Sequence, residues 1–139
     1  MRIQQVAIAA IKKENKYLLT KRVKMDPEDV DYAPFVWHLP GGGIEKDENS
    51  ETALKREIKE ELGVEIHSAI LIPKTFTDTR RNWQGVFILF LCSLMDYNQE
   101  IILNEESEEY GWFTLEEASK LKVLPHTIEM IVEANKLRI

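Results

Sequence analysis

The sequence is poor in the features that mark secreted, membrane-spanning or disulfide-bonded proteins. It contains a single cysteine, Cys92, which excludes an intrachain disulfide framework and a cysteine-based zinc site. Its longest apolar run, residues 86–92, is far shorter than the roughly 20 residues that a helix needs to span a bilayer. The N-terminus lacks the apolar stretch and small-residue cleavage site of a signal peptide. We therefore expect a cytoplasmic protein without membrane association.

Basic residues are also in the minority, 18 against 24 acidic ones. The net charge of −6 argues against general nucleic-acid binding, which usually needs a basic surface. The charges are segregated: residues 12–24 carry six bases and one acid, residues 45–65 eight acids and four bases, and residues 100–117 seven acids and no base. Acidic clusters beside a basic strand suit a site that holds divalent cations and phosphate together, although solvated surfaces give the same pattern.

A length of 139 residues and a hydrophobic content of 44% predict one globular domain, residues 1–139, and no repeat or linker-like segment divides it. Hydrophobic periodicity predicts an α/β fold, with a mixed β-sheet between helices on both faces. A strand from Trp37 should run into a glycine turn at residues 41–43. The other strands are expected at residues 4–11, 17–23, 64–79, 85–94, 101–103 and 110–113.

Helices are expected over residues 50–62, 114–121 and about 127–137. The first has apolar residues at helical spacing, a capping residue at Asn49 or Ser50, and Gly63 where a left-handed residue ends a helix. The second begins with the spacing of a capping box. The third should bury four apolar side chains: Ile128, Ile131, Val132 and Leu137.

The helix over residues 50–62 carries three carboxylates on one side. Glu57, Glu60 and Glu61 share an arc of roughly 100°, next to the apolar arc, because successive residues turn by about 100°. Such like charges cost a few tenths of a kcal/mol per pair when nothing compensates them. Oxygen-rich clusters are preferred ligands of Mg²⁺ and Mn²⁺, so this arc is a candidate metal site. A solvated acidic face would have the same pattern.

The same helix lies within a longer motif of fixed spacing. The stretch reads Gly42-x5-Glu48-x7-Arg56-Glu57-Ile58-x-Glu60-Glu61-x-Gly63-Val64. At every defined position it resembles the signature of the Nudix hydrolases, Gly-x5-Glu-x7-Arg-Glu-U-x-Glu-Glu-x-Gly-U, in which U is a bulky aliphatic residue. Within the motif, Gly42 suits a backbone geometry closed to residues with side chains. Glu48 and Arg56 can pair to orient the other carboxylates.

The resemblance implies a Nudix-type α/β/α sandwich. It also implies metal-dependent hydrolysis of a pyrophosphate bond in a nucleoside diphosphate-linked substrate, with Mg²⁺ or Mn²⁺ as the cofactor. Glu57, Glu60 and Glu61 would bind the metal, and one of them could also be the base that activates water. The carbonyl of Gly41 would be a further ligand. Metal ions would lower the pKa of the attacking water and neutralise the charge that builds on the phosphate oxygens.

Two positions outside the motif also resemble functional residues of the family. Some members recruit another glutamate from a loop near the C-terminal strand, and Glu106 is the best-placed match, with Glu105 or Glu109 as alternatives. Arg22 resembles the family arginine that meets the substrate's phosphates, although an exposed cation at a strand end would look the same. A small-molecule nucleotide is therefore the expected partner, bound by a monomer or a homodimer.

The identity of the substrate is not contained in the motif. Downstream landmarks of ADP-ribose and dinucleoside polyphosphate hydrolases are not found, since Thr79 and Arg80 stand in that region. Nucleoside triphosphates, other nucleotide sugars and capped or triphosphorylated RNA 5′ ends remain open. The polar turn at residues 80–83 and the loop at residues 24–35 should set substrate choice. The candidate base-stacking residues are Trp83, Phe35, Tyr32 and Trp37.

Two other classes of protein compete with the hydrolase interpretation. Enzymes of the isopentenyl diphosphate isomerase type share the fold but need a catalytic cysteine and usually a degenerate motif, whereas Cys92 lies in an apolar run. Non-catalytic Nudix-fold regulators bind a nucleotide and typically lose a motif glutamate, and none is lost here. His38, next to the glycines, is either a residue that faces the site or an ordinary strand residue.

Overall fold

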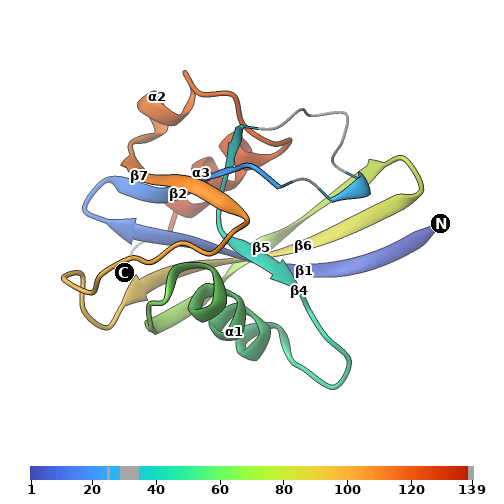
Figure 1. Cartoon of the computed structure of the whole chain (residues 1–139), viewed down its shortest axis with the longest axis horizontal. Coiled ribbons are helices and arrows are strands. Elements are labelled where there is room, and N and C mark those ends of the chain that lie inside the picture. Colours follow the sequence, from blue (N-terminus) through green and yellow to red (C-terminus); the bar gives the residue numbers. More distant parts are fainter. Residues whose placement is uncertain (25, 29–34, 138–139) are drawn as a thin grey trace.

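The structure is a computed structural model, and it describes residues 1–24, 26–28 and 35–137. Within these ranges the chain forms a mixed sheet with helices packed against it (Figure 1). In chain order the elements are β1 (Arg2–Lys13), β2 (Lys16–Arg22), β3 (Val36–His38), β4 (Gly41–Gly43), α1 (Ser50–Leu62), β5 (Ile66–Arg80), β6 (Trp83–Leu94), β7 (Ser107–Phe113), α2 (Leu115–Ala118) and α3 (Thr127–Asn135).

The long strand β1 organises the sheet. It pairs in parallel with β6, from Arg2 opposite Trp83 to Ile11 opposite Cys92. Its other edge is shared, because residues 6–8 pair with β4 and residues 12–13 pair with β2. From β2 the sheet continues to β3 and β7, and β5 pairs with β6 on the far side. These other pairings are antiparallel, so the sheet is mixed as expected.

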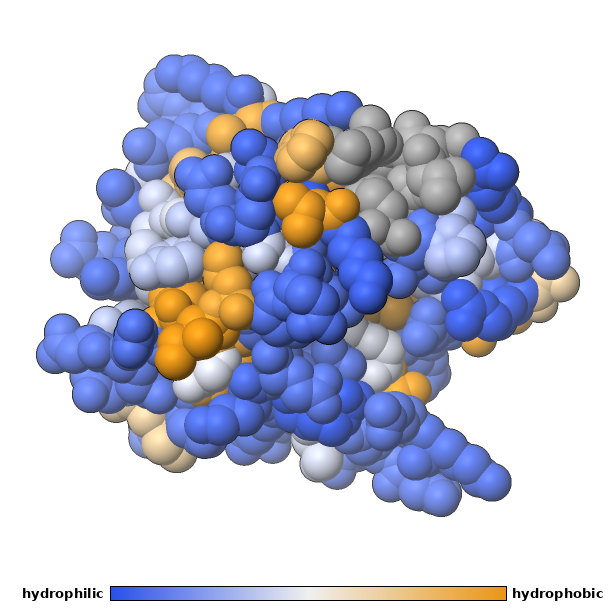
Figure 2. All heavy atoms as spheres, in the orientation of Figure 1, coloured by the Kyte–Doolittle hydropathy of each residue, from blue (hydrophilic) through white to orange (hydrophobic). Residues whose placement is uncertain are grey.

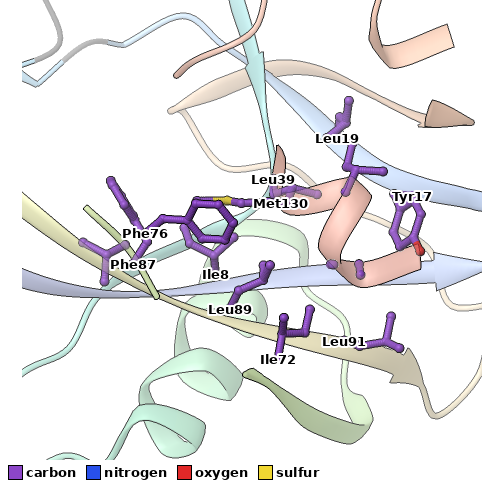
Figure 3. Packing of buried hydrophobic residues seen from close by; sticks show 14 of the residues in the cluster. Ile8, Tyr17, Leu19, Leu39, Ile72, Phe76, Phe87, Leu89, Leu91 and Met130 are labelled. Atoms are coloured by element: carbon purple, nitrogen blue, oxygen red, sulfur yellow. The ribbon is translucent and has the colours of Figure 1, made fainter. Parts of the chain in front are cut away.

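Side chains alternate along β1 and therefore enter two separate cores. One core lies between the sheet and α3 (Figure 3), and it includes Val6, Ile8, Ala10, Met130, Ile131 and Ala134. The other lies between the sheet and α1, and it includes Ala7, Ala9, Ile11, Leu54, Ile58 and Leu62. The helices α1 and α3 thus cover opposite faces of the sheet (Figure 1), which confirms the predicted α/β class and sandwich arrangement.

Two of the predicted strand features differ from the structure. Residues 101–103 do not form a strand, because this segment runs past the end of α1, where the Ile102 N–H donates to the Leu62 carbonyl at 2.9 Å. The glycines at residues 41–43 do not form a turn, because they pair with β1 as the strand β4. Both differences arise from contacts with distant segments, which local sequence patterns do not reveal.

The two C-terminal helices are shorter than predicted. The capping box of α2 is present, with both Thr114–Glu117 hydrogen bonds formed, but the helix ends at Ala118. In α3 the buried positions are Thr127, Met130, Ile131 and Ala134, which share one face at helical spacing. Val132 falls outside that face and is 38% exposed, so its predicted burial was wrong.

One view of the surface is largely hydrophilic. Figure 2 shows polar and charged residues over most of this face, with hydrophobic residues confined to small areas. In the part of the chain that the structure describes, no helix has both the length and the apolar character needed to cross a membrane.

Candidate active site

The helix α1 begins and ends as its sequence predicts. The side chain of Asn49 accepts a hydrogen bond from the Thr52 N–H at 2.8 Å, which caps the first turn. Gly63 ends the helix with a φ of 70°, and its N–H donates to the Lys59 carbonyl at 3.0 Å. The apolar arc is fully buried, and its residues are Leu54, Ile58 and Leu62. Burial of this arc fixes the neighbouring glutamate arc beside β4.

Arg56 connects the glutamate helix to β4 and to the loop between them. Its Nε and one terminal nitrogen bind the two carboxylate oxygens of Glu48, at 2.7 and 2.9 Å. The same terminal nitrogen donates to the Gly43 carbonyl at 3.0 Å, and the other donates to Glu57 Oε1 at 2.8 Å. The hydrogen bonds from Arg56 lower the pKa of Glu48 to about 2. The predicted Glu48–Arg56 pair is confirmed, and its bidentate geometry fixes the orientation of Glu57.

The glycine strand β4 allows the Glu57 carboxylate to approach the backbone closely. A Cβ on Gly42 would overlap that carboxylate, and a Cβ on Gly41 would overlap the Ala7 carbonyl oxygen. Gly42 does not have a positive φ. Close approach of Glu57, rather than an unusual backbone conformation, is therefore the reason for glycine at position 42, which corrects the sequence interpretation.

Glu61 is the most buried of the three glutamates, with 9% of the residue exposed. Its Oε2 accepts a hydrogen bond from the Gly41 N–H at 3.3 Å, which joins α1 to the start of β4. Burial, and after it the negative charges of Glu57 and Glu106, raise the pKa of Glu61 to about 8, against the opposing effects of the Gly41 N–H and Arg22. Burial is the largest cause of this raised pKa, and the neighbouring negative charges add to it.

Glu57 and Glu60 differ from Glu61 in their surroundings. Burial raises the pKa of Glu57, while its hydrogen bond from Arg56 opposes the increase. The Glu60 side chain is 57% exposed, and its contact with Arg56 is longer, at 3.5 Å. The three motif glutamates thus range from exposed to buried along one side of α1.

Glu106 faces this cluster from the segment before β7. Its carbonyl accepts hydrogen bonds from the Val23 and Lys24 N–H groups at 2.9 and 3.3 Å, which holds it beside the end of β2. Its charge raises the pKa of both Glu57 and Glu61. The two alternative glutamates, Glu105 and Glu109, are both exposed, and Glu109 Oε1 lies 3.9 Å from Lys21 Nζ.

The donor set suits a hard divalent cation. Among the described residues, no three acidic, histidine or cysteine side chains already have the arrangement of a completed metal site. The charge of Glu106 nevertheless adds to the raised pKa of both Glu57 and Glu61, and Arg56 is shared with Glu48. Oxygen ligands with excess negative charge are the ligands that Mg²⁺ and Mn²⁺ prefer.

A cavity lies on the opposite side of β4, between the sheet and α3. The glycines of β4, Arg22 and His38 line one part of it, and Arg80, Trp83 and Phe87 line another. Arg22 also lowers the pKa of Glu61, so its guanidinium is close to both the cavity and the glutamates. One of its terminal nitrogens lies 3.5 Å from Asp26 Oδ2. The sequence prediction that Arg22 meets substrate phosphates is compatible with this position.

The sequence places Trp83 in a polar turn, but in the structure Trp83 lies in a strand. The turn consists of residues 81–82, whereas Arg80 ends β5 and Trp83 begins β6. Trp83 is 6% exposed, and its Nε1–H donates to Gln4 Oε1 at 3.0 Å. Both Trp83 and Arg80 line the cavity. A role for Trp83 in substrate binding stays a prediction.

The other candidate stacking residues have different surroundings. Trp37 is buried and packs edge to face against Phe113, with ring centroids 5.1 Å apart, and it is not among the residues that line the cavity. Phe35 is exposed, and Lys21 Nζ lies 5.7 Å from its ring centroid. Tyr32 lies outside the described residues, as do residues 25, 29–31, 33 and 34 of the predicted specificity loop.

The sequence left open whether His38 faces the site, and in the structure His38 lines the cavity. Its Nδ1 lies 2.9 Å from the Leu39 carbonyl and its Nε2 lies 3.3 Å from the Thr20 hydroxyl. Burial, followed by the charge of Arg22, lowers the pKa of His38 to about 3, so the ring is neutral. Because a carbonyl only accepts, Nδ1 carries the proton and the Thr20 hydroxyl donates to Nε2.

Sequence reasoning missed Gln4 and Thr127 as cavity residues, whereas Arg80 lies in the segment at residues 80–83 that the sequence predicted to set substrate choice. The alternation along β1 was the available signal for Gln4, because it places this amide on the same face as Val6 and Ile8. Arg80 and Thr127 reach the cavity from β5 and α3, which meet only in the folded chain.

The glycine strand, the glutamate helix braced by Arg56 and the mixed sandwich define a hydrolase of the Nudix class. The family model of the NUDIX domain matches residues 1–133, and the chain belongs to this family. It is a Nudix-type pyrophosphohydrolase.

Known proteins support this assignment. The nucleoside triphosphatase NudI of Escherichia coli O139:H28 is 34% identical over 122 residues, which cover 81% of this chain and 82% of NudI. The MutT Nudix hydrolase from Burkholderia pseudomallei matches with a TM-score of 0.80 and 26% identity, over 96% of this chain and 98% of that one. The ORF135 protein of E. coli matches with a TM-score of 0.75 and 25% identity, over 99% of this chain and 92% of that one.

Proposed function

We propose that this protein hydrolyses a phosphoanhydride bond of nucleoside triphosphates with the help of Mg²⁺ or Mn²⁺. The ligands of the metal are the carboxylates of Glu57, Glu60, Glu61 and Glu106 and the carbonyl of Gly41. The observation that carries the proposal is the environment of Glu61, a buried carboxylate whose pKa is raised to about 8 beside two further carboxylates. A divalent cation would relieve this concentration of negative charge, and the adjacent cavity carries Arg22 for the phosphates.

The cation would lower the pKa of the attacking water and neutralise charge on the phosphate oxygens. The side chains of this chain supply orientation and proton transfer. Arg56 fixes Glu57 by the hydrogen bond at 2.8 Å, Arg22 binds nonbridging phosphate oxygens, and one of the three motif glutamates accepts a proton from water. A bond forms from the water oxygen to phosphorus while the bond from phosphorus to the bridging oxygen breaks. The bridging oxygen leaves with the other phosphate group.

Two observations favour nucleoside triphosphates among the nucleotides. NudI, which is 34% identical to this chain, is described as a nucleoside triphosphatase. The cavity also carries Arg22 beside the glycine strand, where a phosphate chain needs a cation. A triphosphorylated or capped RNA 5′ end is the one nucleic-acid substrate that we keep as an alternative. We also retain the cytoplasmic location and the monomeric or homodimeric state as predictions from the sequence.

A nucleotide panel tests the proposed function directly. We expect phosphate or pyrophosphate release from nucleoside triphosphates in Mg²⁺ or Mn²⁺, loss of release in EDTA, and recovery when the metal is restored. Turnover that persists in metal-free buffer would contradict the mechanism. Tight nucleotide binding without any turnover would instead identify a non-catalytic regulator with the Nudix fold.

A further inference from the structure

The first residues of β1 bring a carboxamide into the cavity. Gln4 precedes Val6 by two positions, and alternation along the strand places both side chains on the cavity side of the sheet. Gln4 is the one asparagine or glutamine among the described residues that line the cavity. A carboxamide has two N–H donors and one acceptor oxygen, so its effect on a ligand depends on which end of the amide faces the ligand.

Trp83 determines the orientation of this amide. The indole Nε1–H donates to Gln4 Oε1 at 3.0 Å, and because an indole nitrogen only donates, the oxygen of the amide must face the tryptophan. Trp83 is itself buried, and its ring packs edge to face against Phe87 with centroids 6.2 Å apart. The acceptor of Gln4 is therefore occupied, and its NH₂ group is left for another partner.

The NH₂ group of Gln4 lies beside the glycine strand. A Cβ on Gly43 would overlap Gln4 Nε2, and the Gly43 carbonyl already accepts from Arg56. In the part of the chain that the structure describes, Nε2 has no hydrogen-bond partner. Every fully buried side-chain nitrogen or oxygen of the described residues does have a partner. The unpaired Nε2 is therefore accessible from the cavity that Gln4 lines.

The register of β1 gives the distance between this amide and the proposed metal site. Gly41 pairs with Ile8, and Gly43 pairs with Val6. Two residues of a strand span roughly 7 Å, so an amide beside Gly43 lies about that far along the sheet from the Gly41 carbonyl. This separation leaves room for a ribose between a phosphate held at Gly41 and a base held at Gln4.

The cavity wall next to Gln4 suits a flat ring. The apolar lining includes Ile8, Phe87 and Met130, which lie together on the α3 side of the sheet (Figure 3). Pockets with mostly apolar and aromatic walls and a few fixed polar groups are typical of small-molecule sites, in which the polar groups set the specificity. A base in this part of the cavity would meet the NH₂ group of Gln4.

The arginines of the cavity wall do not provide the same selectivity. Arg22 lies 3.5 Å from Asp26, and Arg80 donates to Asp78 at 2.7 Å. Their charges attract the phosphates that all nucleoside triphosphates share, so they favour no base over another. Gln4, a neutral donor, differs from them in this respect.

We propose that Gln4 selects the nucleobase by donating a hydrogen bond from Nε2 to a carbonyl oxygen on the base edge. The inference rests on the proposed function, and it names uracil, thymine and guanine as favoured over cytosine and adenine. An amide that offers only its NH₂ group binds a carbonyl oxygen but gives the amino group of cytosine or adenine no acceptor. Trp83 is a positioning residue, because it acts on the base through Gln4.

Matched pyrimidine nucleotides provide the test, because UTP and CTP differ at one base edge by a carbonyl and an amino group. We expect the parent to prefer UTP by about five- to tenfold in kcat/KM, the effect of one neutral hydrogen bond. Gln4→Glu keeps an oxygen for Trp83 and replaces the NH₂ group with a second oxygen, so it should reverse the preference. Gln5→Glu makes the same change at an exposed position on the opposite face of β1 and should leave the preference unchanged.

Trp83→Phe tests the positioning role. It keeps an aromatic ring but removes the indole N–H, so either end of the Gln4 amide can turn toward the base. The ratio of UTP to CTP turnover should then fall toward one, although Gln4 itself is unchanged. If Trp83 served packing alone, the variant would keep the ratio of the parent, and this result would overturn the positioning role.

Binding measurements separate this inference from catalysis. Calorimetry with UTP and CTP in EDTA, where no turnover is expected, should show the same preference in the parent and its reversal in Gln4→Glu. If melting curves show that Gln4→Glu is unfolded, Gln4→Leu replaces it, and this variant should lower UTP binding to the level of CTP. A parent that prefers CTP or shows no preference, or an equal loss for both nucleotides in the variant, overturns the inference and leaves the proposed function standing. Absence of turnover with every nucleotide in Mg²⁺ or Mn²⁺ contradicts the proposed function, and the inference falls with it.

Discussion

At the scale of single residues, neighbouring glutamates of one helix turn have very different surroundings. Glu61 is buried and bonded to the backbone of β4, whereas the Glu60 side chain is 57% exposed. An exposed acid beside other acids contributes little to folding, because like charges on one helix face repel each other. We therefore expect Glu60 to serve as a metal ligand rather than to stabilise the fold.

Replacing Glu60 with Gln tests that explanation. Without metal, Glu60→Gln should be as stable as the parent or more stable by a few tenths of a kcal/mol, since repulsion is relieved while shape is kept. Activity should fall by orders of magnitude. Because a ligand stabilises the folded state by RT ln(1 + [L]/Kd), millimolar Mg²⁺ or Mn²⁺ should raise the melting temperature of the parent more than that of the variant.

The control for this experiment is Glu65→Gln, which removes an exposed acid that pairs with Lys59 beyond the glutamate arc. It should keep both activity and the metal response. A fully active Glu60→Gln with the melting behaviour of the parent would remove Glu60 from the site.

The predicted role of Arg22 in phosphate binding can be tested with a single substitution. Charge-assisted hydrogen bonds contribute roughly 1.5–3 kcal/mol, so Arg22→Ala should raise KM for nucleoside triphosphates by about tenfold or more. The fold should survive, because Arg22 ends a strand that keeps its backbone pairing with β3 and β7. Lys24→Ala removes an exposed cation nearby and serves as the control in the same kinetic assay. Unchanged kinetics of Arg22→Ala would make Arg22 an ordinary surface cation.

At the scale of elements, the glycine strand β4 separates the glutamate helix from the cavity. Gly42 faces Glu57, while a Cβ on Gly43 would meet only the end of the flexible Gln4 side chain. Gly42→Ala should therefore displace the Glu57 carboxylate and reduce kcat at least tenfold, because a shift of about 1 Å can cost two orders of magnitude. Gly43→Ala should retain most of the activity. Circular dichroism and melting curves of both variants would show whether the fold is kept, and equal activities would contradict the proposed contact.

The elements also show which structural features a sequence can predict. The bounds of α1 were predicted correctly, because its apolar spacing, the Asn49 cap and the Gly63 terminus are all local signals. The strand β4 was not, since three glycines have no periodicity and become a strand only by pairing with residues 6–8. The end of β5 and the start of β6 were not predicted either. The segment at residues 80–83 is mostly polar and is typical of a turn, and its strand residues are defined only by the pairing of Arg80 with Trp83.

At the scale of the whole molecule, protonation of Glu61 links stability to pH. The pKa of Glu61 is about 8 in the folded chain and near 4.5 when unperturbed, so above pH 4.5 the folded chain keeps a proton that the unfolded chain has lost. The free energy of unfolding of the metal-free protein must then fall as pH rises toward 8. His38 acts in the opposite direction below pH 6.5, because its pKa is lowered to about 3 in the folded chain.

Between about pH 6.5 and 8 the contribution of His38 is constant, so the change in stability reports on the buried carboxylates, Glu61 first and then Glu57, whose pKa is also raised. Across this range the metal-free protein should lose on the order of 1–2 kcal/mol of stability in urea titrations, and Glu61→Gln should lose much less. Stabilisation by Mg²⁺ should increase over the same window, because metal and proton compete for the carboxylate. A flat stability profile of the parent would contradict the raised pKa of Glu61.

The whole fold was predictable as a class, and the arrangement of its site only in part. The motif indicated the glutamates and Arg56, and their local spacing ensured that they share one helix side. The cavity was not predictable, because Arg22, Arg80 and Thr127 come together from three elements that are distant in sequence. Long-range pairing, rather than any local pattern, brings these side chains to one wall.

The parallel pairing of β1 with β6 also governs how this molecule folds. It joins segments about 80 residues apart, and the intervening chain contains the glycine strand and the glutamate helix. Closing so long a loop costs conformational entropy before the contacts between the two strands can stabilise it. Folding rates therefore fall as contacts become less local. Refolding should therefore take milliseconds to seconds rather than microseconds. The motif residues, although close together in sequence, become a working site only once this loop has closed.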